Sequence, residues 1–348
     1  MNYKVLRYLL FFLLLHVTCK RSVDDNRGDD NPFNNKIVRC SIALDDDMYE
    51  NDGLEAGLNY ELLKIFSQEN NCSVETKVYT KKEKPLDSLS QKKIDILVTE
   101  KEKIEQVDSI FSTTYICNST VWVTKNDKFE EIEYLNRWLL KYMRTEDFKN
   151  LKQRFIQQYD PIKRAESMKK YYKLSPYDNL IKKEAIRLGW DWKMLVAVLW
   201  QESRFSINSR SHRGAEGLMQ VMPSTGVYYD IYDLLDPYDN IEAGTKHLNR
   251  VQRIFRKYNL SDEELVKFTL AAYNAGEGRI MDCMNLAEYL GKDKTKWSDI
   301  VEAIPHMNDE ALHEEGGVRL GKFRGKETIE YVDNILKIYD ALKSISID

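Results

Sequence analysis

The spacing of apolar residues changes near residue 170, and this change limits the folds that the chain can adopt. Residues 36–160 alternate short apolar runs with helical stretches, a pattern typical of strands and helices around one sheet. Residues 175–348 show helical spacing almost throughout. A chain of 348 residues is long enough for about two domains. The sequence therefore predicts an α+β multidomain protein, an α/β module followed, after a linker at 161–174, by a mostly α module.

Composition excludes several classes of protein. Hydrophobic residues make up 43% of the chain and aromatic residues 11%, which is enough for a core and excludes wholesale disorder. The net charge is −4 and no long basic tract occurs, so we expect no nucleic-acid partner. No Cys/His spacing suggests a metal, and we predict neither a metal nor a cofactor.

The N-terminus has the pattern of an export signal. Lys4 and Arg7 precede a seven-residue apolar run at 9–15, which is too short to span a bilayer. We therefore predict a signal peptide at 1–18. Cys19 follows the run and resembles the lipidated cysteine of bacterial lipoproteins, which implies an outer-membrane lipoprotein facing the periplasm. Ordinary signal cleavage with an incidental Cys19 is the alternative.

The next segment, residues 19–35, is polar, rich in Asp and Asn and without apolar period. It is expected to be a flexible tether. Four cysteines follow it, and they can pair in three ways or remain thiols: Cys40, Cys72, Cys117 and Cys283.

The module at 36–160 is predicted to contain a parallel sheet built from βαβ units. The expected strands are 37–44, 73–80, 94–99 and 120–124. The expected helices are 59–69, 86–92 and the helical stretch at 130–160.

Three strings in this module resemble the solute-binding proteins of amino-acid transporters. They are Gly57-Leu58-Asn59-Tyr60-Glu61-Leu62, Lys93-Ile94-Asp95-Ile96-Leu97, and the stretch from Val107 to Tyr115. Such proteins have two lobes, whereas here the strand at 120–124 leads almost directly to the closing helices. The resemblance therefore implies a single lobe. That lobe either binds a wall fragment or muropeptide, or it docks and spaces the second module; we expect it to regulate or place the second module.

The second module contains an acidic residue in an apolar setting. Gly189 is expected to end one helix, and Asp191 to cap the next at 192–203. Glu202 shares the apolar face of that helix near its C-terminal end. Desolvation and the helix dipole both favour the protonated carboxyl there and raise its pKa, as a general acid requires. The alternative is that Glu202 bends outward to pair with Arg204 or Lys193.

Four further strings stand in order along this module. They are Glu202-Ser203-Arg204-Phe205, residues 214–225 (GAEGLMQVMPST), residues 271–276 (AAYNAG) and residues 327–332 (ETIEYV). With these strings the module resembles the lytic transglycosylase domain with the goose-lysozyme-like fold, most of all the membrane-bound type that carries a solute-binding-like module.

The resemblance implies a carbon–oxygen lyase that acts on the glycan strands of peptidoglycan in cell wall turnover. Glu202 is implied as the single general acid/base. It would cleave the β-1,4 bond between N-acetylmuramic acid and N-acetylglucosamine and leave 1,6-anhydromuramic acid ends. The muramic acid O6 hydroxyl attacks its own ring, so no second carboxylate is needed to activate water.

The resemblance also implies substrate contacts for Ser211, Gly217, Met219, Gln220, Met222, Tyr273, Asn274 and Tyr331. For Tyr331 a hydrogen bond to Glu202 is the alternative. For the two methionines core packing remains an alternative, and for Ser211 a plain surface loop. The cluster of Tyr228, Tyr229 and Tyr232 is expected to pack between helices rather than to stack on sugars.

Two other functions remain open. A lysozyme-type hydrolase that inverts would need a second carboxylate about 6.5–9.5 Å from the acid. Residues 221–224 supply none, although Asp230 or Asp233 could fold back. A non-catalytic wall-binding sensor is the third hypothesis.

Overall fold

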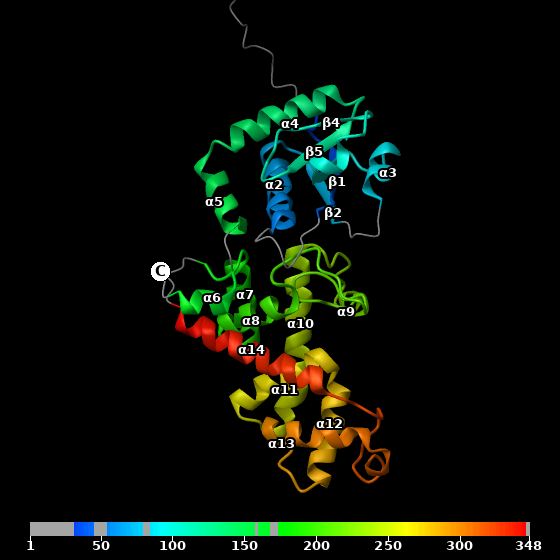
Figure 1. The fold of residues 1–348 in the computed structure, drawn as a ribbon, viewed down its shortest axis with the longest axis vertical. Coiled ribbons are helices and arrows are strands. Elements are labelled where there is room, and N and C mark those ends of the chain that lie inside the picture. The colour runs from blue at the N-terminus through cyan, green and yellow to red at the C-terminus, as the bar shows by residue number, and fades with distance from the viewer. Residues whose placement is uncertain (1–30, 45–53, 79–83, 157–158, 168–172, 346–348) are drawn as a thin grey trace, which may run out of the picture.

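The computed structural model describes residues 31–44, 54–78, 84–156, 159–167 and 173–345. The predicted signal peptide and Cys19 lie outside these residues. Two parts are stacked along the long axis, a part that contains a sheet and a helical part (Figure 1). This agrees with the predicted order of an α/β module followed by a mostly α module.

The sheet of the N-terminal part has five strands in the order β2-β1-β3-β5-β4. They are β1 (Ile37–Ile42), β2 (Ser73–Val78), β3 (Ile96–Glu100), β4 (Ile110–Ser112) and β5 (Thr120–Lys125). β1 is parallel to β2 and β3, but β5 is antiparallel to both β3 and β4. The prediction of a parallel sheet is therefore wrong in its second half. The 3₁₀ helix η1 (Lys101–Ile104) follows β3, and β4 and β5 are joined by only seven residues, 113–119, which reverse the chain. A parallel crossover needs about a dozen residues or more, usually with a helix.

The helices of this part are α2 (Glu55–Glu69), α3 (Pro85–Ser90), α4 (Phe129–Tyr142) and α5 (Glu146–Ile156). α2 buries Leu62, Leu63 and Phe66 completely. The Phe66 ring meets Trp138 of α4 edge-on at 5.0 Å between centroids. α4 begins four residues after β5 ends, and the part described has one sheet, with α2 and α4 packed on one face and α3 on the other. Its likeness to a solute-binding lobe remains a prediction.

The predicted tether and linker both include residues that belong to the fold. Phe33 is buried and meets Phe66 edge-on at 5.2 Å, so the tether cannot extend to residue 35. In the predicted linker, α6 (Pro161–Glu166) is capped by Asp160 and packs against α14 (Lys326–Ser344). The buried Arg164 of α6 donates to the Lys173 carbonyl at 2.7 Å. Both segments are therefore held to the core by specific apolar and polar contacts. The composition of a segment does not reveal such contacts.

The helical part is built around α8 (Trp192–Ser203), whose residues 195–199 are fully buried. Gly189, with φ of +69°, ends the preceding helix, and Asp191 caps α8 as predicted, accepting from the Lys193 amide. The other elements are α7 (Asp178–Leu188), α9 (Pro223–Tyr228), α10 (Pro237–Phe255), η2 (Arg256–Tyr258), α11 (Asp262–Ala275), α12 (Glu277–Tyr289), α13 (Trp297–Ala303), η3 (Ile304–Asn308) and η4 (Glu310–Leu312).

All four cysteines that follow the tether are free thiols: Cys40, Cys72, Cys117 and Cys283. Burial is the main cause that raises the pKa of each thiol, for Cys283 to about 12. Thiols that stay protonated are poor nucleophiles, so these cysteines have a packing role.

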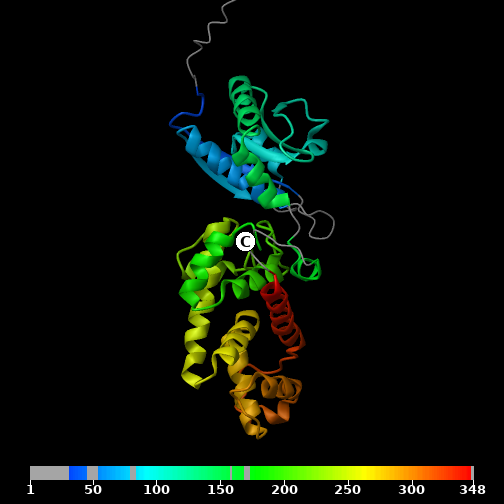
Figure 2. The ribbon, with the colours of Figure 1, turned by 90° about the vertical axis from the view of Figure 1, so that its left-hand side faces the viewer.

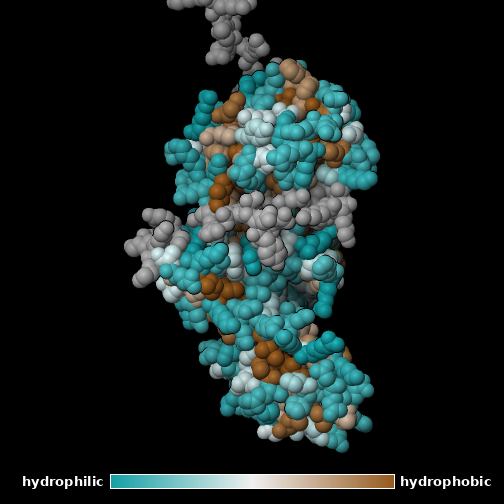
Figure 3. Space-filling model, viewed as in Figure 1, coloured by the Kyte–Doolittle hydropathy of each residue, from teal (hydrophilic) through white to brown (hydrophobic). Residues whose placement is uncertain are grey.

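The surface drawn in Figure 3 is mostly hydrophilic, with small apolar patches. Among the residues that the structure describes, no helix combines the length and the apolar character needed to cross a bilayer.

The two parts meet where α2 approaches the start of α10, and α10 runs from this contact along the helical part (Figures 1 and 2). Tyr60 of α2 donates a hydrogen bond to Asp236, the N-cap of α10. Tyr238 donates to Glu61 at 2.9 Å, and Asn208 donates to the Leu44 carbonyl at 3.0 Å. The buried residues of both parts form one continuous cluster, so we expect the two parts to unfold together.

Gly57→Ala is expected to destabilise the protein. A Cβ at Gly57 would lie 2.7 Å from a Phe155 ring carbon and 2.9 Å from the Tyr177 hydroxyl. The clash is expected to cost about 1–3 kcal/mol of unfolding free energy, measured by urea denaturation. Gly278→Ala is the matched control. Its Cβ would meet only the end of the exposed Leu320 side chain, and alanine favours the helix. Equal stability of the two variants would contradict this account of Gly57.

Candidate active site

Glu202 lies in the last turn of α8 and is half-buried. Its Oε1 accepts a hydrogen bond from the Tyr331 hydroxyl at 2.5 Å. Burial raises the pKa of Glu202 to about 7, against a smaller lowering by the Tyr331 hydrogen bond. Lys193, named as an alternative partner, instead donates to the Leu342 carbonyl at 2.9 Å. The predicted raised pKa of Glu202 is therefore present, and its main cause is burial, one of the two causes expected.

The chain turns sharply after Glu202. Arg204 and Phe205 both have positive φ, +51° and +68°, which is a strained conformation for residues other than glycine. Phe205 is buried, and its ring lies 5.6 Å from Trp200 and 5.7 Å from Tyr159. This aromatic packing holds the turn and so fixes the end of α8 that carries Glu202.

Two tyrosines face the acid from other helices. Tyr331 of α14 is buried, and Tyr273 of α11 donates its hydroxyl proton to the Met219 carbonyl at 2.8 Å. The pKa of each phenol is raised, first by burial and then by the charge of Glu202. Both hydroxyls therefore stay protonated and act as hydrogen-bond donors.

The loop that follows α8, residues 206–222, is held by a residue that sequence reasoning missed. Asn240 of α10 is fully buried. Its amide nitrogen donates to the carbonyls of Glu216 (2.8 Å) and Leu234 (2.7 Å), and its oxygen accepts from the Met219 amide (2.7 Å). The sequence signal that could have pointed to Asn240 is its position beside Ile241, where the apolar face of a helix begins.

Gly217 and Met219, which were expected to contact substrate, have packing roles. Gly217 has φ of +72°, and a Cβ there would lie 2.3 Å from the Leu234 carbonyl oxygen. Met219 is fully buried against Gly244 of α10. Met219 therefore packs in the core, which was the alternative to a contact with substrate. The close approach at Gly217 comes from the protein's own backbone.

Ser211 and Gln220 shape the same loop. The Ser211 hydroxyl oxygen accepts from the Ala215 amide at 2.9 Å. Gln220, with φ of +48°, donates to the Gly217 carbonyl at 2.9 Å. Both residues are half-buried. Their predicted contacts with substrate remain predictions.

Met222 and Asn274 are more accessible. Met222 precedes α9 and is 40% exposed. Asn274 is exposed, and its side-chain oxygen accepts from the Thr328 hydroxyl at 2.8 Å, which joins α11 to α14. The donor nitrogen of the Asn274 amide is thus the group left for a ligand.

The acids considered for a hydrolase are engaged elsewhere or exposed. Asp233 accepts from the amides of Leu235 (3.1 Å) and Asp236 (3.3 Å). Asp230 is exposed in the turn after α9. The pKa of Glu202 responds to burial and to Tyr331 and not to any described carboxylate. Among the described residues, no group of three or more His, Cys, Asp or Glu side chains is placed to hold a metal ion.

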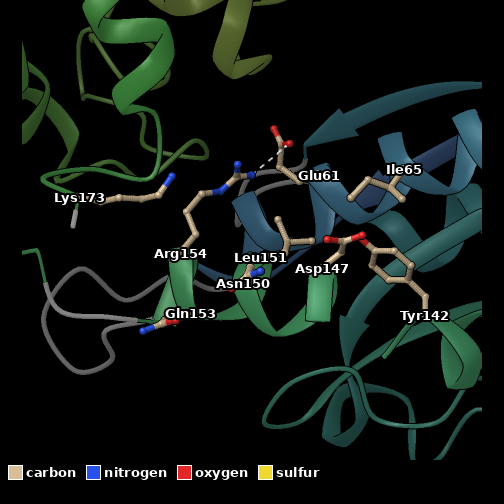
Figure 4. A pocket seen from close by; sticks show the side chains of 9 residues that line it. All are labelled: Glu61, Ile65, Tyr142, Asp147, Asn150, Leu151, Gln153, Arg154 and Lys173. Atoms are coloured by element: carbon tan, nitrogen blue, oxygen red, sulfur yellow. Dashed lines mark ion pairs between the residues drawn. The ribbon is translucent and has the colours of Figure 1, made fainter. Parts of the chain in front are cut away.

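A hollow of about 550 Å³ lies away from Glu202, between α2 and α5 (Figure 4). Glu61 and Arg154 form an ion pair of 3.2 Å in its wall. The lining also includes Tyr142, Asp147, Asn150 and Lys173. Its mixed polar lining could accept a small polar molecule, and it belongs mainly to the N-terminal part.

Tyr331→Phe is expected to move the pH profile of the site. The Tyr331 hydrogen bond lowers the pKa of Glu202, so its loss raises that pKa above about 7. A general acid must be protonated, and activity falls as the pH rises through its pKa. The falling limb of kcat/KM is therefore expected to shift to higher pH in rates measured between pH 5 and 9. An unchanged limb would show that Tyr331 does not tune Glu202.

A half-buried acid with a pKa near 7, bonded by a tyrosine within a mostly helical module, is the arrangement of a general acid–base enzyme. Residues 179–296 match the family model described as "Transglycosylase SLT domain". The helical part of the chain therefore contains a region, residues 179–296, that is similar to transglycosylase SLT domains.

Curated relatives carry the name "Membrane-bound lytic murein transglycosylase F". The relative from Desulfosudis oleivorans is 34% identical over 173 residues, 50% of this chain and 37% of that protein. The relative from Marinobacter nauticus is 35% identical over 175 residues, 50% of this chain and 34% of that protein. The matched stretches thus span about a third of the length of these relatives.

Among solved structures, the chain is similar to the 70 kDa soluble lytic transglycosylase of Escherichia coli. The identity is 27% and the TM-score 0.34, over 49% of this chain and 24% of that one.

Proposed function

We propose that the chain is a peptidoglycan lytic transglycosylase. It cleaves the β-1,4 bond between N-acetylmuramic acid and N-acetylglucosamine and leaves 1,6-anhydromuramic acid ends. One observation carries this proposal: Glu202, with a pKa of about 7, meets a tyrosine and no described carboxylate. A single acid/base of this kind suits a reaction that needs no activated water.

The mechanism uses the two oxygens of Glu202 differently. Tyr331 donates to Oε1, so the proton of the neutral carboxyl resides on Oε2. Oε2 passes this proton to the glycosidic oxygen as the bond to the muramic acid C1 breaks. The resulting carboxylate then takes the proton of the muramic acid O6 hydroxyl while O6 bonds to C1. The intramolecular attack benefits from a high effective concentration of the nucleophile.

Analysis of the products tests the proposal. Purified peptidoglycan digested in ¹⁸O-labelled water is examined by mass spectrometry. Anhydro ends without label support the transglycosylase, whereas reducing ends that carry label indicate a hydrolase. Binding to the wall without any cleavage would favour the third function, a non-catalytic wall-binding sensor.

We also propose that lipid on Cys19 holds the chain at the outer membrane, facing the periplasm. The order of apolar run and cysteine supports this anchor, and the curated relatives are named membrane-bound. Cys19→Ala is expected to move the chain from the membrane fraction to the soluble fraction of the cell envelope. Cys72→Ala is the control and should stay with the membrane. A Cys19→Ala chain that remains in the membrane fraction would overturn the anchor.

For the N-terminal part we propose a role in placing or regulating the catalytic part, with a wall fragment as its ligand. The hollow beside Glu61 and Arg154 supports a ligand, and the bonds from Tyr60 and to Glu61 support coupling to α10. Soluble muropeptides should change the rate at which the full chain cleaves peptidoglycan. A rate that is the same with and without them would contradict the ligand.

A further inference from the structure

A line of aromatic rings leads from the acid toward solvent. Tyr273 of α11 lies 5.5 Å from His247 of α10, His247 lies 6.4 Å from Tyr229, and Tyr229 lies 4.9 Å from Tyr228. Tyr273 is close enough to Glu202 for their charges to interact. We call Tyr273, His247, Tyr229 and Tyr228 the aromatic line. It starts beside Glu202 and ends at the surface.

The outer end of the line is not core. Tyr228 is 70% exposed and Tyr232 is 75% exposed, so the expectation that these tyrosines pack between helices is wrong for both. The reason is that α9 is only six residues long and presents Val227 and Tyr228 outward, while Gly226 faces Leu234. Met222, which precedes α9, is 40% exposed, so exposed apolar side chains stand at both ends of this helix.

Polar groups border the line where it is half-buried. Arg250 of α10 and Glu277 of α12 form an ion pair of 2.6 Å, and each is about one-third exposed. Arg250 lies close enough to Tyr229 to lower its pKa, although burial raises that pKa more. Burial, followed by Arg250, lowers the pKa of His247, so its ring is neutral near pH 7. The surface therefore combines uncharged ring faces with charged hydrogen-bonding groups at its edge.

We propose that Tyr228, Tyr229 and His247 form a binding subsite for sugar rings of the glycan strand, beyond the bond that Glu202 cleaves. This subsite rests on the proposed function. A pyranose has an apolar C–H face that suits an aromatic ring, and hydroxyl and acetamido groups that suit Arg250 and Glu277. The strand is the occupant because the line is continuous with Tyr273 at the acid.

The subsite predicts that affinity depends on strand length. Binding is measured by calorimetry with the full chain carrying Glu202→Gln, so that the ligand stays intact, and with peptidoglycan glycan fragments of four and eight sugars. Adding Tyr228→Ala is expected to weaken binding of the eight-sugar fragment about fivefold, the effect of losing one stacked ring. The four-sugar fragment should lose less. Tyr228→Phe, which keeps the ring, should restore the affinity.

Tyr232→Ala is the matched control, because Tyr232 is as exposed as Tyr228 but lies outside the aromatic line. Equal affinity of the chains with Tyr228 and with Tyr228→Ala would overturn the subsite, and so would an equal loss in Tyr232→Ala. Cleavage by the chain with Glu202 intact is measured separately. Length-dependent binding without cleavage would contradict the proposed function and support the subsite, and a failure to bind either fragment would overturn both.

Discussion

Glu202→Gln is expected to abolish cleavage of peptidoglycan, with kcat lower by about 10³-fold or more. The amide has nearly the shape of the carboxyl and can still accept the Tyr331 hydrogen bond, but it cannot donate and then take up the catalytic proton. Positioned acid–base groups contribute about 10²- to 10⁴-fold, and here one group serves both steps. Release of soluble fragments from purified peptidoglycan measures the loss.

The control for this variant is Glu242→Gln. Glu242 lies on α10 and pairs with Lys246 at the surface, so its change should leave the rate within about twofold. Circular dichroism should show both variants folded. A Glu202→Gln chain that retains full lytic activity would remove Glu202 from the mechanism.

Asn240→Ala is expected to lower both stability and activity. The change removes two buried hydrogen bonds and one that is partly buried. It leaves the Met219 amide and the Leu234 carbonyl without this partner, whereas the Glu216 carbonyl still accepts from the Val221 amide at 3.0 Å. Each unsatisfied buried group costs about 1–3 kcal/mol, so for these two groups a total loss of about 2 kcal/mol or more is expected in urea denaturation. Because Tyr273 bonds to the Met219 carbonyl, a displaced loop also moves Tyr273 beside Glu202, and kcat should fall as well.

Asn285→Ala is the matched control for Asn240. Asn285 donates a single exposed hydrogen bond to the Gly317 carbonyl at 3.1 Å. Its loss should cost well under about 1 kcal/mol. A stability loss at Asn240 no larger than that at Asn285 would contradict its role in holding the loop.

Local features of the chain were predictable from its sequence. Asp191 caps α8 and Gly189 ends α7 as expected, because capping depends on residues within one turn of the helix end. The helix at 192–203 and the burial near Glu202 follow from helical spacing over a few turns. The helical stretch expected at 130–160 in the N-terminal part is present as α4 and α5.

Predictions that required the path of the chain in space were less successful. The sheet is mixed because the chain reverses after β4 and β5 then pairs with β3, which the spacing of apolar residues does not reveal. Phe33 belongs to the core although its neighbours are polar. Tyr228 is exposed although an aromatic cluster usually indicates packing. For Phe33 and Tyr228 the residue type alone does not show whether the side chain will contact the core or the solvent.

The sequence by itself determined the two-part order, the helices of the second part and the one acid placed on an apolar helix face. These depend on interactions between residues a few positions apart. Only the tertiary structure decided that Tyr331 bonds Glu202, that Asn240 holds the loop at 216–219, and that rings from α9, α10 and α11 form one line. Tyr331 and Glu202 are 129 residues apart, and contacts of that range arise when helices pack and bury their apolar faces together.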